Sequence, residues 1–190
     1  MNEVRRLAAR LVYENDVVRV FDDDVAFASG RVGRHVRIET TAPGEGVVLV
    51  VQDGGRTALV ETFRYPLGAP QLALPRGFGH GPDVVASARA EALEELGVRL
   101  GEVKVLGHVT PDSGLQAGRV AVVTARVAEH LPGGTRDHDE VSAVQWLTPD
   151  ELQSRIAAGR VEDGFTLAAL ALEHARQAGT GAAAPRRPTS

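Results

Sequence analysis

The chain contains no cysteine, one methionine, one tryptophan and only 4% aromatic residues among its 190 residues. Without cysteine, disulfide bonds, thiol nucleophiles and thiolate metal sites are excluded, and the composition suits a reducing compartment. No run approaches the ~18 apolar residues of a membrane-spanning helix. Residues 1–7 also lack the apolar core of a signal peptide. We therefore expect a soluble, cytoplasmic protein with no membrane partner.

An excess of basic residues is missing as well. The formal net charge is -4, whereas a protein that binds a nucleic-acid backbone normally carries a basic stripe. We therefore expect no nucleic-acid partner. With 43% apolar residues, the chain has enough material for one sizeable domain and a small appendage.

Residues 1–45 are predicted to form a small antiparallel β domain. Residues 17–20 are rich in β-branched side chains, and residues 34–39 alternate between polar and apolar. Between them, three consecutive aspartates at 22–24 are expected to break the first strand. Strands this short leave exposed edges when they stand alone.

Residues 46–178 are predicted to form an α/β/α sandwich with a mixed sheet, because strands flank a central helix and further helices follow. Residues 47–51 are a continuous apolar run, typical of a strand buried on both faces. The expected strands are 47–51, 57–62, 103–109, 120–128 and 141–147; the expected helices are 84–96, one opened by Pro149, and 165–178. Residues 179–190, rich in Ala, Pro, Thr and Arg, are predicted to be a disordered tail.

Three glutamates, Glu91, Glu94 and Glu95, lie in the predicted central helix. Residues three and four apart share a helix face, where like charges repel each other. A hard cation such as Mg²⁺, which takes oxygen ligands, would turn this cluster into a binding site. From these residues alone, a solvated acidic face ahead of a helix-ending Gly97 stays an open alternative.

Together with Gly97 and Val98, the glutamates match the second half of the Nudix box, G-x5-E-x7-R-E-U-x-E-E-x-G-U, where U is a bulky apolar residue. The chain therefore resembles the Nudix hydrolases. The first half of the box departs from the pattern. Its glycine falls on Arg76, its first glutamate on Pro82 and its arginine on Ala90.

Flanking segments narrow the resemblance to the ADP-ribose pyrophosphatases of this family. Residues 63–68 (Phe-Arg-Tyr-Pro-Leu-Gly) and 74–77 (Leu-Pro-Arg-Gly) are similar to passages near their active site. Residues 146–152 and 159–169 are similar to later segments. The likeness covers roughly residues 12–178. It implies a Nudix sandwich preceded by a small β domain through which such enzymes form homodimers.

The resemblance also implies the roles of individual residues. Glu91 and Glu95 would be the principal ligands of Mg²⁺, with Mn²⁺ as a second option, and Glu94 and the backbone carbonyl of Arg76 would support them. Glu140 would supply the general base, so that Glu140 and Glu94 are the expected catalytic carboxylates. Arg64 and Arg76 would hold the substrate, since a guanidinium donates two parallel hydrogen bonds to a phosphate.

The implied activity is Mg²⁺-dependent hydrolysis of a nucleoside diphosphate sugar such as ADP-ribose, giving AMP and a sugar phosphate. The alternative is a catalytically weakened Nudix fold that binds a nucleotide as a sensor or structural partner. Ala90, Pro82 and Ala73, which stands where many relatives have an acid, favour that alternative. Arg89 cannot replace the missing arginine, because at ~100° per residue it points about 160° away from Glu91. Residues 77–81 are interpreted as a permissive glycine-rich loop, and the scattered histidines, His80 among them, are assigned no role.

Overall fold

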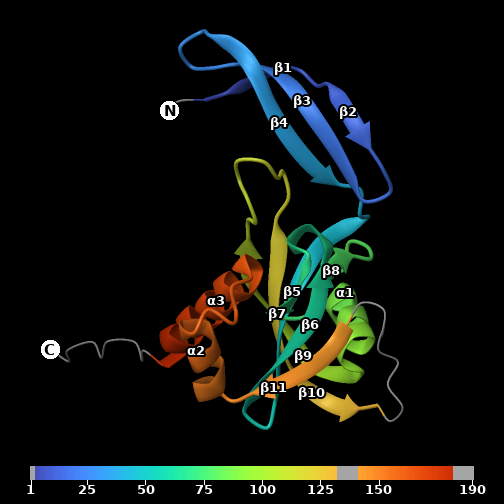
Figure 1. Cartoon of the computed structure of the whole chain (residues 1–190), viewed down its shortest axis with the longest axis vertical. Coiled ribbons are helices and arrows are strands. Elements are labelled where there is room, and N and C mark those ends of the chain that lie inside the picture. The colour runs from blue at the N-terminus through green and yellow to red at the C-terminus, as the bar shows by residue number, and fades with distance from the viewer. Residues whose placement is uncertain (1–2, 132–140, 182–190) are drawn as a thin grey trace, which may run out of the picture.

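The computed structural model describes residues 3–131 and 141–181 (Figure 1). The N-terminal sheet consists of β1 (Arg5–Ala8), β2 (Leu11–Glu14), β3 (Val18–Ala26) and β4 (Val32–Thr40), all paired antiparallel. β1 and β2 lie end to end along one edge of β3, and β4 lies along the other edge. The predicted antiparallel β region is therefore present, at one end of the molecule.

The three aspartates at 22–24 do not break a strand, contrary to the sequence prediction, but lie inside β3. Arginines of β4 and of the link between β1 and β2 compensate their charges. Arg37 Nε donates to Asp23 Oδ2 at 2.8 Å, Arg10 Nη2 donates to Asp24 Oδ2 at 3.1 Å, and Arg34 pairs with Asp22. Cross-strand pairs of opposite charge stabilise a sheet, and these outweigh the poor strand propensity of aspartate.

The larger sheet has the strand order β11-β6-β5-β10-β9, with β7 paired to β6 and β8 paired to β5. Its strands are β5 (Gly44–Asp53), β6 (Arg56–Arg64), β7 (Ala69–Ala73), β8 (Arg76–Gly79), β9 (Val98–Val109), β10 (Val120–His130) and β11 (Val141–Leu147). β5 and β10 run parallel, and the other described pairings are antiparallel. The sheet is therefore mixed, as expected.

Helices cover both faces of this sheet (Figure 1). Val47, Leu49 and Val51 of β5 pack against the side of α1 (Val84–Glu91), whereas Val48 and Val50 pack towards α3 (Gly164–Gly181). α2 (Pro149–Ala157) lies on the α3 side, where Leu152 packs with Leu59. This two-sided burial explains the unbroken apolar run of β5 and confirms the predicted α/β/α sandwich.

The central helix begins and ends where the sequence predicts, but its last turn differs. Asp83 Oδ1 caps it by accepting from the backbone N–H groups of Val85 and Ala86 at 2.8 and 3.1 Å. Gly97 ends it with a left-handed φ of 67°. Between α1 and Gly97, residues Ala92–Leu96 form a π-helical turn. Such turns often mark functional sites, and this one carries two of the three glutamates.

The loop before β10 connects the N-terminal sheet to the larger domain. Ile38 N–H in β4 donates to Leu115 O at 2.8 Å, and Ala117 N–H donates to Ile38 O at 3.1 Å. These hydrogen bonds extend β4 by a short pairing with the loop. The N-terminal sheet is therefore fixed beside the end of the larger sheet that carries β8.

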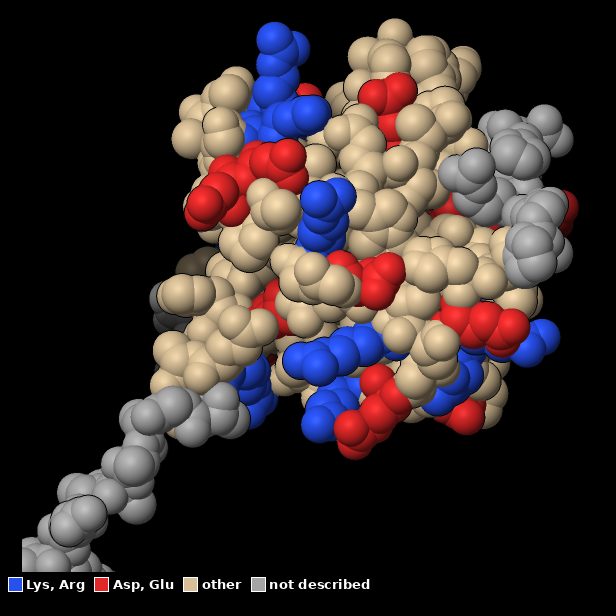
Figure 2. Space-filling view, turned by 90° about the horizontal axis from the view of Figure 1, so that it is seen from below, with Lys and Arg blue, Asp and Glu red and all other residues tan. Residues whose placement is uncertain are grey.

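Acidic and basic side chains are interspersed over the face shown in Figure 2. Within the described residues, no helix is long and apolar enough to cross a membrane. α3 continues through Gly181, so the first residues of the predicted 179–190 tail are helical, and the rest of that tail lies outside the described residues.

Candidate metal and phosphate site

The three glutamates differ in exposure. Glu91, the last residue of α1, and Glu95, in the π turn, are 7% and 6% exposed, whereas Glu94 is exposed. Glu95 Oε2 accepts from the backbone N–H of Arg76 in β8 at 3.0 Å. The helix and β8 thus hold each other in place through one of the predicted ligands.

Gly77 allows β8 to approach the helix closely. A Cβ atom at this position would lie 1.9 Å from Glu91 Oε1, a distance that no side chain tolerates. The interpretation of residues 77–81 as a loop is therefore wrong for its first part, since Gly77 is a strand residue paired with Val47. The missing side chain leaves room for the Glu91 carboxylate against the β8 backbone.

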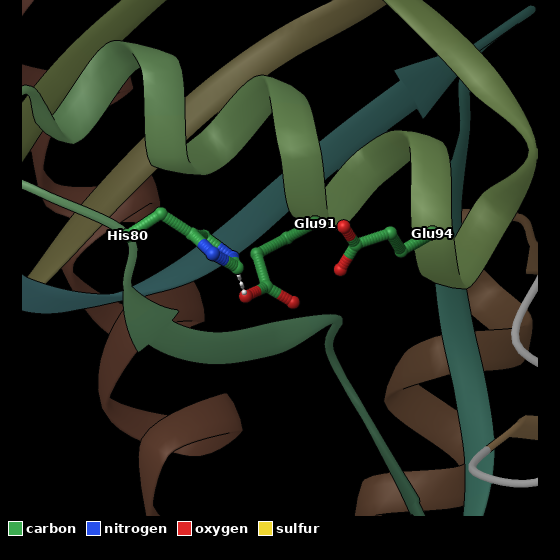
Figure 3. Close-up of side chains that lie close together, drawn as sticks. All are labelled: His80, Glu91 and Glu94. Atoms are coloured by element: carbon green, nitrogen blue, oxygen red, sulfur yellow. Dashed lines mark hydrogen bonds and ion pairs between the residues drawn. The ribbon is translucent and has the colours of Figure 1, made fainter. Parts of the chain in front are cut away.

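His80, which the sequence analysis left without a role, joins the glutamates. Its Nε2 lies 3.1 Å from Glu91 Oε1, and Figure 3 shows both carboxylates and the imidazole turned towards one another. One ligand atom each from His80, Glu91 and Glu94 lie within 4.8 Å of one another. Two carboxylates and an imidazole are a donor set that fits a divalent cation.

These side chains line a cavity of about 740 Å³, and a second cavity of about 350 Å³ adjoins it. The first is bordered by Glu91, Glu94, Glu95 and His80. The second lies between β4, β8 and the loop before β10, and its lining includes Ile38, Phe78, Gln116, Arg119 and Phe165. Arg64, Arg76 and Gly77 line both cavities. The two predicted substrate-binding arginines therefore lie where the cavities meet.

Both arginines have buried donors. Arg76 Nη2 pairs with Asp163 Oδ1 at 3.1 Å, and its guanidinium lies 4.7 Å from the ring centre of Phe165. Among the described residues, Arg76 Nε and the Nε and Nη2 of Arg64 find no hydrogen-bond partner. Burial lowers the pKa of Arg76, Asp163 counteracts this effect, and the positive charge of Arg64 adds to the lowering. Unpaired donors in such a place favour binding of an anion.

The remaining residues singled out in the sequence do not join this site within the described part of the chain. Glu140 lies outside the described residues. Arg89 donates to the carbonyls of Leu100 and Gly101 at 2.5 and 2.7 Å, which confirms that it points away from Glu91. Ala73 is fully buried in β7.

The site combines a donor set for a divalent cation with two guanidiniums that have unpaired donors among the described residues. This combination is typical of proteins that bind a phosphorylated ligand together with a metal ion. The NUDIX domain family model matches residues 40–170, and the chain belongs to this family. The resemblance based on Glu91, Glu94 and Glu95 is thereby confirmed, and with it the assignment to the Nudix pyrophosphohydrolases. Members of this family generally use divalent metal ions.

Two relatives extend over nearly the whole chain. The methanol dehydrogenase activator of Bacillus methanolicus is 23% identical over 170 residues, 88% of this chain and 91% of that protein. A crystal structure of an ADP compounds hydrolase superposes with a TM-score of 0.80 at 16% identity, covering 95% of this chain and 97% of that one. At this identity the superposition establishes the fold, including the N-terminal sheet.

Proposed function

We propose that this protein hydrolyses the diphosphate bond of a nucleoside diphosphate sugar such as ADP-ribose, with Mg²⁺ or Mn²⁺, and releases AMP and a sugar phosphate. The observation that carries this proposal is the position of Arg64 and Arg76. Both side chains line the acidic cavity and the second cavity, and both have buried donors without a hydrogen-bond partner among the described residues. A diphosphate placed there would have one end near the glutamates. The structural neighbour is an ADP compounds hydrolase, which supports the same substrate class.

The cation would be held by Glu91, Glu94 and Glu95 together with the backbone carbonyl of Arg76. When bound, it supplies charge neutralisation of phosphate oxygens and a water of lowered pKa. The close approach of Gly77 to Glu91 supports this assignment, because it keeps the carboxylate at the cavity wall. Glu95 would fix the backbone of Arg76 through its hydrogen bond.

The arginines would orient the substrate. Arg64 would donate to the diphosphate through Nε and Nη2, the fork geometry that suits phosphate. Asp163 and Phe165 hold the Arg76 guanidinium in place, so little side-chain entropy is lost on binding. The second cavity, with Phe78 and Phe165 in its wall, would take the nucleoside or the sugar.

Glu140 would act as the general base, as the family resemblance implies. A positioned base typically contributes about 10²–10⁴-fold in rate. Glu140 directly precedes β11, which begins at Val141 and pairs with Thr62 in β6. Two residues along β6 from Thr62 lies Arg64, at the end of that strand. The residue that follows Glu140 in the sequence is therefore paired near the end of β6 that carries Arg64, which supports the proposed role.

A homodimer formed through residues 12–45 is also part of the proposal. Leu11, Val12 and Tyr13 of the edge strand β2 are 49%, 54% and 55% exposed, and unpaired edges with apolar side chains favour association. Light scattering at micromolar concentration should report a dimer, and Tyr13→Glu should shift it towards monomer. A monomeric wild-type protein would contradict this part of the proposal. Cytoplasmic location stays a prediction that the lack of cysteine supports.

A panel of nucleoside diphosphate derivatives assayed with Mg²⁺ for release of AMP or a phosphate monoester tests the main proposal. Arg64→Lys keeps the charge but loses the fork, so we expect at least a tenfold loss in kcat/KM, about 1.4 kcal/mol. Arg99→Lys is the matched control, since Arg99 is exposed and pairs with Glu129 on the surface. Tight nucleotide binding by calorimetry without hydrolysis would instead establish the sensor alternative, which the departures at Pro82 and Ala90 favour.

A further inference from the structure

We infer that His80 is a nitrogen ligand of the divalent cation held by Glu91 and Glu94, and that it makes this site select a transition-metal ion such as Mn²⁺ or Co²⁺ over Mg²⁺. The inference rests on the proposed function for the presence of a cation at these glutamates. It adds a residue that lies outside the helix and changes the chemistry of the site. Three observations carry it: the spacing of the ligand atoms, the anchoring of His80, and a comparison with other histidine–carboxylate pairs.

The spacing fits a shared metal ion. In an octahedral shell with bonds of ~2.1 Å, neighbouring ligands lie about 3.0 Å apart and opposite ligands about 4.2 Å apart. His80 Nε2 and Glu91 Oε1 are separated by 3.1 Å, and the ligand atoms of all three side chains lie within 4.8 Å. Small side-chain rotations therefore suffice to bring all three onto one ion.

His80 is also anchored on both sides. Its backbone N–H donates to Ser87 Oγ at 3.1 Å, and Ser87, 1% exposed, lies one helical turn before Glu91. On the other side, Gly79 packs so tightly that a Cβ would lie 2.4 Å from Glu45 O. The backbone of His80 is thus fixed relative to the helix that carries the carboxylates, which is the preorganisation that a metal ligand needs.

Other histidine–carboxylate pairs show what His80 has in addition. His108 lies 3.2 Å from Glu45, and His130 lies 2.8 Å from Asp53. Within the described residues, only the group of His80, Glu91 and Glu94 brings three potential ligands within metal-binding range. A simple ion pair needs one carboxylate; the second one, Glu94, is what distinguishes this group.

The identity of the donors sets the expected metal preference. Mg²⁺ prefers oxygen ligands and keeps several waters. Imidazole nitrogen favours first-row transition ions, whose affinity rises from Mn²⁺ to Co²⁺. One imidazole among carboxylates should therefore raise the affinity for Co²⁺ and Mn²⁺ relative to Mg²⁺, and its removal should lower that ratio.

The test measures the ligand directly. Pulsed electron paramagnetic resonance on the full chain with Mn²⁺ should show ¹⁴N modulation from the imidazole. His80→Asn should abolish this signal, while His108→Asn, the matched control, should keep it. Calorimetry should show at least a tenfold weaker binding of Co²⁺ to His80→Asn, with a change of under about threefold for Mg²⁺. His80 is half-exposed, so its substitution leaves the core intact.

The outcomes separate this inference from the proposed function. Binding of Mn²⁺ that is lost in Glu91→Gln but gives no ¹⁴N modulation in the wild type would overturn the role of His80 alone. An unchanged Co²⁺/Mg²⁺ affinity ratio in His80→Asn would do the same. Mn²⁺ binding that Glu91→Gln leaves unaffected would overturn the metal site itself, and the proposed function with it.

Discussion

The two sheets of this protein are stabilised in different ways. In the larger sheet, Val47–Val51 of β5 are fully buried between helices. In the N-terminal sheet, Val25 and Asp23 are the buried side chains among the described residues. Cross-strand ion pairs such as Arg37–Asp23 and Arg34–Asp22 connect its strands instead. The larger domain thus carries its own core, while the N-terminal sheet depends on charge pairing and on surfaces outside itself.

The sheet with the smaller core nevertheless contributes to the candidate site. The candidate site lies on the larger domain, but its second cavity is completed by Ile38 and Thr40 of the N-terminal sheet. The hydrogen bonds between Ile38 and the loop before β10 hold that wall in place. A region with little core of its own therefore shapes the cavity that we assign to the substrate. The following predictions test this division, beginning with the largest effect.

Glu95→Gln should remove most metal-dependent activity and leave the fold intact. The change deletes one ligand charge, and a loss of several kcal/mol in transition-state stabilisation corresponds to about 10²–10⁴-fold in kcat/KM. Glutamine retains the oxygen that accepts from Arg76 N–H, and the repulsion from Glu91 and Glu94 falls, so the metal-free protein should keep or gain stability. Steady-state kinetics and thermal unfolding measure both. Near wild-type turnover at saturating Mg²⁺ would show that the metal site is placed wrongly.

Leu49→Ala, in the larger sheet, should lower the free energy of unfolding far more than Leu11→Ala, in the N-terminal sheet. Leu49 is fully buried in β5, and truncation of such a residue costs about 2–5 kcal/mol. Leu11 in β2 is 49% exposed, so its truncation should cost within about 0.5 kcal/mol in a monomer. Urea unfolding at two protein concentrations checks this. A cost for Leu11→Ala that grows as the protein is concentrated would locate the dimer interface there.

Local signals made several features of the fold predictable. The run at 47–51, the helix start at residue 84 and the helix end at Gly97 each depend on residues close in sequence, and each prediction is confirmed. The strand through Asp22–Asp24 was missed because the arginines that neutralise it come from other segments of the chain. Ion pairs between residues far apart in the sequence leave no local pattern, whereas hydrophobic periodicity and helix caps do.

The site was predictable only in part, for the same reason. The glutamates follow from a spacing within one helix, and Arg64 and Arg76 from short motifs. The contact of Gly77 with Glu91 and the approach of His80 depend on how β8 packs against α1, which no local pattern encodes. The π-helical turn adds to this, because its residue spacing differs from that of the α-helix that the sequence analysis assumed for Glu94 and Glu95.

Asp23→Asn and Glu173→Gln should shift stability in opposite directions at pH 7. Hydrogen bonding to Arg37 lowers the pKa of Asp23, so its stabilisation is present above the unfolded pKa of ~3.9 and is lost as the pH falls further. Burial raises the pKa of Glu173, against hydrogen bonds from Thr124 and Gln177. Ionised Glu173 therefore destabilises the fold at neutral pH, and this penalty is relieved towards its unfolded pKa of ~4.3.

At pH 7, Asp23→Asn should thus lower the free energy of unfolding and Glu173→Gln should raise it, each within roughly 0.5–3 kcal/mol. The amide that Glu173→Gln introduces keeps an oxygen for the donors Gln52 and Thr124. Both differences from wild type should shrink as the pH approaches about 3.5. Chemical denaturation across this range measures them. Differences of equal sign would contradict the opposite pKa shifts of Asp23 and Glu173.

Ala90→Arg has the smallest expected effect and distinguishes a weakened hydrolase from a nucleotide sensor. Ala90 stands at the box arginine, four residues before Glu94, so a guanidinium there would orient the carboxylates through charge-assisted hydrogen bonds. A several-fold rise in kcat/KM on the best panel substrate, about 1 kcal/mol, is expected. Ala86→Arg, exposed one turn earlier on the same helix, is the control and should change nothing. If neither the wild type nor Ala90→Arg hydrolyses any panel substrate while calorimetry shows tight nucleotide binding, the site binds a nucleotide without cleaving it.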